Sequence, residues 1–422
     1  MKRMQILYFA SLIFILIMSG CSTAAPIVPT STPFLQQITP AGINEPPETN
    51  MTPTVAAIPV SPEWVATEAS HELIYRSDCV TIDQNPSLDS IQGAIIFADK
   101  RKRFAFSDLV YFDQDTKTFK SLPETASFLT GYTSPSGEKL FYEHTENGVS
   151  SLRLYRLGSQ DLDWDWQEDW STLIGWLDND RFALKSKSSE ESIWLVNTLT
   201  RTVEKVSPVL PDLYRHITSE TAVDPIQWIS VFDPTLSRII YLVGEDTPLG
   251  LVMRDLPEKE ELWKFHKWAI VLTKPAWSFD GKYLAAGAIG DVEDQYKRFE
   301  YYIVDREGHI KWFFDRHEFV NRGPLQTHLV WAPDNQKLAI NIPTVGSPFP
   351  LLIVNTQIGE ITNLCLHDLD IPVTRPIWSP NSDSMVLESL SATYMVDLVK
   401  RKIFQIENNA EVYPIGWLSS IP

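Results

Sequence analysis

A short motif, in which an apolar strand ends on an aromatic residue and a tight turn follows, recurs along this chain. The clearest copies are WSFDG at 277–281, WAPDN at 331–335 and WSPNS at 378–382. In such turns Pro presets φ at the second position, Asp or Asn bonds back to the backbone, and Gly closes the turn. Apolar residues such as Leu284 and Leu338 resume a few positions later. Each copy therefore predicts a β-hairpin.

Weaker copies extend this repeat over most of the chain. They occur at Thr133, Trp176 and Phe232, and a truncated copy lies at Trp417, so that seven turn positions are spaced 39–56 residues apart. A second alternating hairpin follows most copies, for example over residues 301–312. Two hairpins per unit of roughly 40–50 residues are typical of the four-stranded antiparallel blades of a β-propeller.

The repeat thus predicts an all-β fold, a β-propeller with seven blades as the preferred count and six or eight as alternatives. The last copy supplies one strand, around Ile415 to Leu418, whereas residues 93–122 supply three strands without a preceding aromatic turn. We expect the C-terminal strand to pair with the N-terminal blade, because this pairing closes the ring and removes its free edges. The longest spacings suggest insertions at about 208–226 and 288–299.

The W-S-P-D-G-x-x-L-A unit resembles the WD-like repeat of TolB-type β-propellers, and the resemblance covers about residues 90–422. It implies that Trp277, Trp331 and Trp378 pack between blades, and we count Trp176 and Trp417 with them as structural anchors of the repeat. Members of that family include partner-binding periplasmic proteins. The resemblance therefore also implies a binding role.

The first residues of the chain are typical of an export signal. Lys2 and Arg3 precede an uninterrupted apolar run of thirteen residues, 6–18. The apolar centre of a secretory signal has about 7–15 residues, so this run fits one. A helix that spans a bilayer needs about 20 residues, which is longer than this run. The sequence MSGC at 18–21 then resembles the bacterial lipoprotein signal, which implies lipid attachment at Cys21. The alternative is an ordinary signal peptide with an incidental cysteine.

The next segment has a different composition. Residues 22–66 contain nine prolines among Thr, Ser and Ala and show no apolar periodicity. Such a segment cannot bury enough apolar surface to offset the entropy of ordering it. We therefore divide the chain into a lipoprotein signal peptide at 1–20, a Pro/Thr/Ser-rich disordered stalk at 21–66, and the β-propeller at 67–422.

Two cysteines remain besides Cys21, namely Cys79 and Cys365. Disulfides persist in exported proteins, and an even number of cysteines suits their formation. The pair is either a disulfide or two separate buried thiols, and the sequence leaves both alternatives open.

Motifs for catalysis and metal binding are missing from the sequence. No G-x-S-x-G nucleophile elbow occurs, and the eight histidines are scattered singly. Asp161, Asp163 and Asp165 alternate as in a calcium loop, but the glycine and the bidentate glutamate of that loop are missing, so an outer strand with acids facing water fits better. We expect no catalytic residue, no metal and no cofactor.

The formal net charge of −18 excludes one class of partner. A strongly acidic surface repels nucleic acid, so we expect no nucleic-acid binding. The basic run KRKR at 100–103 lies between two predicted strands, which favours a solvated hairpin loop over a docking point for an acidic partner.

These features predict a monomeric lipoprotein, anchored through Cys21 on the periplasmic or cell-surface side of a bacterial membrane. Its propeller would be a non-catalytic binding or scaffold module for a protein or an envelope polymer, held on one propeller face. The alternative is an envelope hydrolase or lyase that acts on glycans through carboxylates gathered at the propeller channel. The tryptophans outside the repeat fit either a glycan-binding face or the packing of outer strands.

Overall fold

The computed structural model describes a set of segments that all lie in one compact unit, Trp64–Pro422. These are residues 71–84, 92–99, 107–113, 116, 118–126, 131–146, 149–156, 164–166, 170–186, 193–206, 231–243, 250–255, 261–265, 270–271, 275–293, 296–319, 328–341, 351–366, 376–389, 392–408 and 412–420. The predicted signal peptide and stalk, the predicted insertion at 208–226 and the basic run at 100–103 lie outside them. None of the described residues forms a helix long and apolar enough to cross a membrane.

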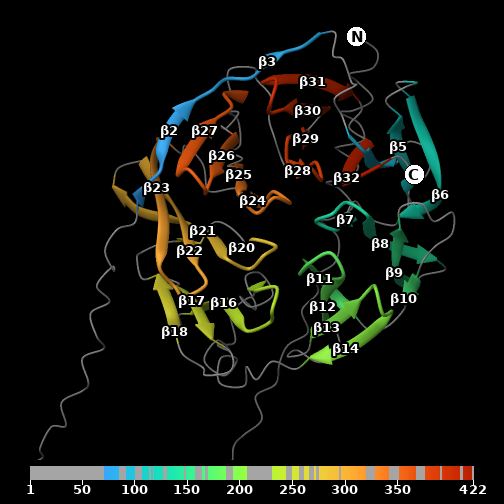
Figure 1. Cartoon of the computed structure of the whole chain (residues 1–422), viewed down its shortest axis with the longest axis horizontal. Coiled ribbons are helices and arrows are strands. Elements are labelled where there is room, and N and C mark those ends of the chain that lie inside the picture. The colour runs from blue at the N-terminus through green and yellow to red at the C-terminus, as the bar shows by residue number, and fades with distance from the viewer. Residues whose placement is uncertain are drawn as a thin grey trace, which may run out of the picture. The chain divides into compact units, whose positions relative to one another are not determined.

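The described strands form seven sheets, of which four have four strands, two have five and one has six. Figure 1 shows them arranged around a common centre, which is the architecture of a β-propeller. The predictions of an all-β propeller and of mostly four-stranded antiparallel blades are confirmed.

Each sheet contains a four-stranded antiparallel unit whose strands we call first to fourth, counted outward from the centre. The first strands are β7 (Gly131–Thr133), β11 (Trp170–Trp176), β15 (Val231–Phe232), β20 (Ala276–Trp277), β24 (His328–Trp331), β28 (Pro376–Trp378) and β32 (Val412–Leu418). The second strands are β8 (Lys139–Glu146), β12 (Arg181–Ser186), β16 (Arg238–Val243), β21 (Tyr283–Glu293), β25 (Lys337–Asn341), β29 (Ser384–Glu388) and β4 (Ala94–Asp99).

The third strands are β9 (Val149–Arg156), β13 (Ile193–Asn197), β17 (Gly250–Asp255), β22 (Tyr296–Asp305), β26 (Leu351–Asn355), β30 (Thr393–Asp397) and β5 (Ser107–Asp113). The fourth are β10 (Trp164–Trp166), β14 (Thr202–Val206), β18 (Glu261–Phe265), β23 (Ile310–Phe319), β27 (Glu360–Asn363), β31 (Lys402–Glu407) and β6 (Thr118–Ala126). A short strand, β19 (Ile270–Val271), pairs with the end of β21.

Two predictions concern single segments of the chain, the closing C-terminal strand and the insertion at 288–299. The C-terminal strand β32 pairs antiparallel with β4, so the last residues of the chain complete the first sheet. The region 288–299, expected as an insertion, is not a separate loop. It lengthens β21 and β22, which stay paired from Tyr283–Asp305 out to Glu293–Tyr296.

Apolar packing between neighbouring sheets makes up the core. One cluster, for example, joins Ile240 and Met253 of one sheet to Leu284 and Val304 of the next, with Trp277 between them. Each sheet is covered on both sides. Its strands therefore place apolar side chains on both faces. The core is therefore a series of interfaces around the ring.

The turns between first and second strands are hydrogen-bonded to one another. The bonds run from Ser136 N–H to Asn179 Oδ1 (2.7 Å), Arg181 Nη2 to the Pro234 carbonyl (2.9 Å), Asp280 N–H to Asn335 Oδ1 (3.1 Å), Asp334 N–H to Ser382 Oγ (2.9 Å), and Ser419 N–H to the Gly137 carbonyl (2.8 Å). Gly137 has a φ of +71°, and a Cβ there would lie 2.5 Å from Pro380 Cγ. The turns thus link the sheets as well as the strands.

Five of the turns between third and fourth strands share a different device, an Asp or Asn as their first residue. The Asp305 carboxylate accepts the backbone N–H groups of Glu307 (3.1 Å) and His309 (2.8 Å). Asp113, Asn197, Asn355 and Asp397 accept backbone N–H groups in the corresponding turns. Side chains of this type stabilise turns by replacing a missing backbone partner.

The N-terminal residues 71–82 form a segment that belongs to no repeat, which we call the strap. Its strands β1 (His71–Glu72), β2 (Ile74–Ser77) and β3 (Thr81–Ile82) pair in parallel with β23, β27 and β31, the fourth strands of three successive sheets. Figure 1 shows it running along the outside of the ring. Two apolar residues between these strands, Leu73 and Val80, are 6% and 3% exposed and join the core.

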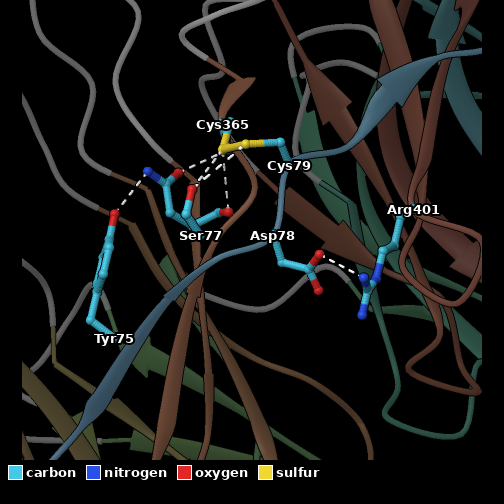
Figure 2. The surroundings of a disulfide bond; sticks show 7 residues. Tyr75, Ser77, Asp78, Cys79, Cys365 and Arg401 are labelled. Carbon is cyan, nitrogen blue, oxygen red and sulfur yellow. Dashed lines mark hydrogen bonds and ion pairs between the residues drawn. A yellow bond between two sulfur atoms is a disulfide. The ribbon is translucent and has the colours of Figure 1, made fainter.

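A disulfide between Cys79 and Cys365 ties the strap to the sheet of β27, across 286 residues of sequence. The Ser77 hydroxyl lies 3.2 Å from the Cys365 sulfur (Figure 2). The Asn363 amide donates to the Tyr75 hydroxyl at 3.0 Å. Closing so long a loop lowers the entropy of the unfolded chain, a stabilisation on the order of 5 kcal/mol in the chain-entropy treatment.

Acid should weaken the turn that Asp305 organises. Burial alone would raise the pKa of Asp305, but hydrogen bonds from the His309 amide, Lys311 and the His309 ring outweigh it and hold the pKa below its ordinary 3.8. A lowered folded-state pKa contributes stability above the unfolded-state pKa, about 4, that is lost as pH falls through the folded-state value.

We therefore expect Asp305→Asn to reduce the loss of unfolding free energy that the protein shows on acidification below about pH 4. Denaturant unfolding at pH 7 and below pH 4 measures this loss. Glu307→Gln, an exposed residue in the same turn, is the control and should leave the loss unchanged. Equal acid sensitivity of Asp305→Asn and the parent protein would contradict the assignment.

Candidate functional site

A cavity of about 470 Å³ lies where the first strands of the sheets converge. Residues of all seven first strands line it, for example Thr133 of β7, Trp176 of β11 and Phe232 of β15. In a propeller this position is the central channel, a common place for ligands. It is the candidate functional site.

The described residues that line the cavity include no Asp, Glu, Lys or Arg, and their one titratable side chain is the imidazole of His328. Their largest groups are six prolines and five tryptophans: Pro135, Pro234, Pro275, Pro333, Pro376 and Pro380, and Trp176, Trp277, Trp331, Trp378 and Trp417. No carboxylate occurs among the described residues of the lining. Such a surface can hold apolar, aromatic or uncharged groups by contact, and it offers no pair of carboxyl groups for acid–base chemistry.

The five repeat tryptophans, which the sequence analysis named individually, lie together in this lining. Each also packs between two sheets: Trp331, for example, contacts a cluster with Ala285 and Ile303 on one side and Leu338 and Val354 on the other. Three of the indole N–H groups donate to backbone carbonyls. The bonds run from Trp331 to Ala276 (2.8 Å), from Trp378 to Val330 (2.9 Å) and from Trp417 to Gln92 (2.9 Å).

Trp277 differs from these three tryptophans. It is 8% exposed, and its Nε1 has no hydrogen-bond partner among the described residues. A buried donor without a partner costs free energy, about 1–3 kcal/mol for an ordinary polar group. Trp277 is therefore a repeat tryptophan whose indole N–H is buried without a partner among the described residues.

One carboxylate in a turn next to the cavity lining, that of Asp280, is hydrogen-bonded within its own turn. Burial alone would raise its pKa, but hydrogen bonds from the Ser278 hydroxyl and from the backbone and ammonium of Lys282 lower the pKa below its ordinary 3.8. A carboxyl group with a lowered pKa is ionised at neutral pH and holds no proton to donate. Asp280 therefore lacks the property of a general acid.

The other named residues lie elsewhere. Cys21 is outside the described residues, and Cys79 and Cys365 lie at the strap, on the outside of the ring. Asp161 and Asp163 are also outside the described residues, whereas Asp165 belongs to the fourth strand β10. The described residues contain no cluster of three or more His, Cys, Asp or Glu side chains with the geometry of a metal site.

Sequence reasoning missed two features of this region. A proline recurs in the turns between first and second strands, and the sequence analysis interprets it as a turn residue only. Pro135, Pro234, Pro333 and Pro380 also line the cavity. Their recurrence at one repeat position was the available signal, because equivalent positions of a propeller lie at equivalent distances from the centre. The strap had no such signal, since its partners are distant in sequence.

The solved structures that resemble this chain are distant from it in sequence. No protein-family model and no curated protein matches the sequence. Similar solved structures include TolB from Acinetobacter baumannii, 12% identical, covering 75% of this chain and 79% of that one with a TM-score of 0.38. An uncharacterized protein from Listeria monocytogenes EGD-e is 10% identical and covers 81% and 98% of the two chains, with a TM-score of 0.48. The tricorn protease is 12% identical, and the match covers 77% of this chain and 36% of the protease, with a TM-score of 0.41.

The indole hydrogen bonds should contribute measurably to stability. Trp331→Phe keeps most of the ring packing but leaves the Ala276 carbonyl without its partner, so we expect a loss of about 1–3 kcal/mol in unfolding free energy. Trp277→Phe is the matched control, because its indole N–H has no partner to lose. Denaturant unfolding of both variants measures the difference, and equal losses would contradict the role given to the hydrogen bond.

Proposed function

We propose that this protein is a membrane-anchored extracytoplasmic lipoprotein whose β-propeller is a non-catalytic binding or scaffold module for a protein or an envelope polymer. The observation that carries the proposal is the described lining of the central cavity, which is aromatic, proline-rich and free of Asp, Glu, Lys and Arg. Such a surface favours contact with apolar and uncharged groups over chemistry on them. We propose that the protein acts as a monomer, in which residues of all seven first strands line the cavity.

The glycan-hydrolase alternative has less support. Glycoside hydrolysis uses two carboxyl groups separated by about 5–10 Å. The described lining of the cavity contains none, and the nearby Asp280 is held in its ionised form by Ser278 and Lys282. We therefore rank the binding module above the enzyme.

Seven separate sheets among the described strands support a count of seven blades for the ring. In this arrangement β32 and the strands β4, β5 and β6 form the closing blade. An experimental structure with a different number of inner strands would contradict the count.

The anchor can be tested directly. We expect the chain, expressed in a bacterium with an alkyne-bearing fatty acid, to incorporate the label and to sediment with membranes. Cys21→Ser should abolish the label, because no other residue of the signal carries a thiol. Ser22→Ala, a change at the neighbouring residue, is the control and should be labelled. Labelling of the Cys21→Ser variant would contradict lipid attachment at this residue.

The binding role predicts that the cavity holds the ligand. We expect the mature chain, used as bait against solubilised envelope extract and against a glycan array, to capture a defined protein or a defined polymer. Trp277→Phe, which changes the shape of the cavity lining, should weaken this capture while folding as the parent does.

The control for capture is a change on the outside of the ring, Leu199→Ser, at an exposed residue of the turn between β13 and β14. Equal capture by Trp277→Phe and the parent protein would move the ligand away from the cavity. Turnover of an envelope glycan by the parent protein would overturn the non-catalytic role.

A further inference from the structure

The strap is an addition to three sheets that are complete without it. The sheets of β23, β27 and β31 each keep four antiparallel strands when the parallel strands β1, β2 and β3 are left out. The strap strands have two, four and two residues. Two buried apolar side chains, Leu73 and Val80, are the part of the strap that joins the core. The blades of the ring therefore do not depend on the strap for their strands.

Most other contacts of the strap lie at the surface. Its ion pairs with the ring, those of Arg76 and Asp78, each include an arginine side chain that is 61% or 62% exposed. Exposed ion pairs contribute little to stability. Backbone hydrogen bonds to carbonyls of the ring complete the non-covalent attachment. The disulfide from Cys79 to Cys365 adds one covalent bond between the strap and the ring.

The two cysteines of this disulfide differ in accessibility. Cys79, on the strap, is exposed, whereas Cys365, which follows β27, is 3% exposed. Thiol–disulfide exchange begins with the attack of a thiolate on one sulfur, and its rate depends on access to that sulfur. An external thiolate therefore reaches the sulfur of Cys79, and the sulfur of Cys365 becomes the leaving group.

A hydroxyl group lies beside both sulfurs. Ser77 Oγ is 3.2 Å from Cys365 Sγ (Figure 2) and 3.6 Å from Cys79 Sγ. Cleavage by attack at Cys79 places negative charge on the sulfur of Cys365, which solvent scarcely reaches. The Ser77 hydroxyl is placed to donate a hydrogen bond to that thiolate, and such bonds to charged groups are strong. After protonation, the Cys365 thiol can donate to the Asn363 carbonyl, 3.6 Å away.

We propose that the Cys79–Cys365 disulfide is a redox switch for the strap, which an external dithiol opens by attack at Cys79. The first thiolate of the dithiol bonds to the Cys79 sulfur as the bond between Cys79 and Cys365 breaks. The second thiolate then bonds to the first sulfur of the dithiol, and the Cys79 thiolate leaves. Two electrons and two protons pass from the dithiol, which becomes a disulfide, to the two cysteines, which become thiols. This switch does not rest on the binding role proposed for the cavity.

Reduction leaves the strap with its non-covalent contacts alone. A segment with few buried apolar contacts opens at a low free energy, independently of the rest of the fold. Its departure uncovers main-chain carbonyls on the outer edges, such as those of Gly359, Asn363 and Arg401, which accept strap N–H groups in the closed state. An uncovered sheet edge can accept a strand from another polypeptide. The switch thus controls whether these outer edges are available for strand addition.

Hydrogen exchange of backbone amides measures the release. Residues 22–422 contain no cysteine besides Cys79 and Cys365, so a dithiol acts on one disulfide in this chain. We expect dithiothreitol to accelerate exchange in the strap by about tenfold or more, while β25 and β26, in the same sheet as β27, keep their rates. Cys79→Ala combined with Cys365→Ala should exchange as the reduced parent does, with or without dithiothreitol.

Two outcomes of this measurement would overturn the switch. One is unchanged exchange in the strap after reduction. The other is equal acceleration in the strap and in β25 and β26, because the disulfide would then stabilise the whole fold and not the strap in particular.

A second measurement locates the attacked sulfur. The probe is a thioredoxin whose second active-site cysteine is replaced by alanine, so that the exchange stops at the mixed disulfide. After alkylation of free thiols, we expect peptide mass analysis to find the probe on Cys79 and the alkyl group on Cys365. Capture on Cys365, or on neither cysteine, would overturn the assigned direction of attack.

The part played by the Ser77 hydroxyl has its own pair of variants. Ser77→Ala should slow reduction by dithiothreitol several-fold, because the leaving thiolate loses a hydrogen-bond donor. Thr81→Val, another change in the strap, removes a hydroxyl that accepts from Lys402 Nζ (2.9 Å), and it should be reduced at the rate of the parent. Equal rates for both variants and the parent would overturn the role of Ser77.

Discussion

The fold depends on the packing of each sheet against its two neighbours. A four-stranded sheet of this size has no interior of its own, so its apolar side chains are buried only when the next sheet covers them. The repeat tryptophans lie in these interfaces, and Trp331 and Trp378 each donate an indole hydrogen bond to the first strand of the preceding sheet. One residue type thus provides apolar contact, a specific register between sheets and part of the cavity wall. The same residues that hold the ring together therefore define the surface offered to a ligand.

Two further sets of contacts connect the sheets away from the core. On one face of the ring, the turns between first and second strands are hydrogen-bonded from sheet to sheet. The Ser419 N–H donates to the Gly137 carbonyl, so the end of the chain takes part. On the outside, the strap adds a parallel strand to three fourth strands. An unpaired edge strand can pair with another chain, and coverage by the strap removes this risk at β23, β27 and β31. The protein therefore covers the edges of three fourth strands with its own residues 71–82.

The sequence allowed the local features to be predicted, because the repeat turn specifies a hairpin through four or five neighbouring residues. The copies at 277, 331 and 378 sufficed for the propeller and for its antiparallel sheets, and the truncated copy at Trp417 indicated the pairing with residues 94–99. The strap could not be predicted in this way. Its parallel strands are two to four residues long, and their partners lie more than 200 residues away, so no periodicity marks them. The cavity shows the same limit. Pro333 lines the cavity wall because the ring closes, and the place of Pro333 in its turn does not reveal this second role.

The placement of Cys79 has a mechanical consequence. A pull on the residues that precede His71 first strips β1 and then β2 from their parallel partners, one hydrogen bond after another. This peeling stops at the covalent bond to Cys365, which transfers the force to the sheet of β24 to β27. The pairing of β32 with β4, on which closure of the ring depends, lies beyond that point in the chain. An oxidised strap therefore isolates the pairing that closes the ring from a pull on the residues before His71, and a reduced strap exposes it.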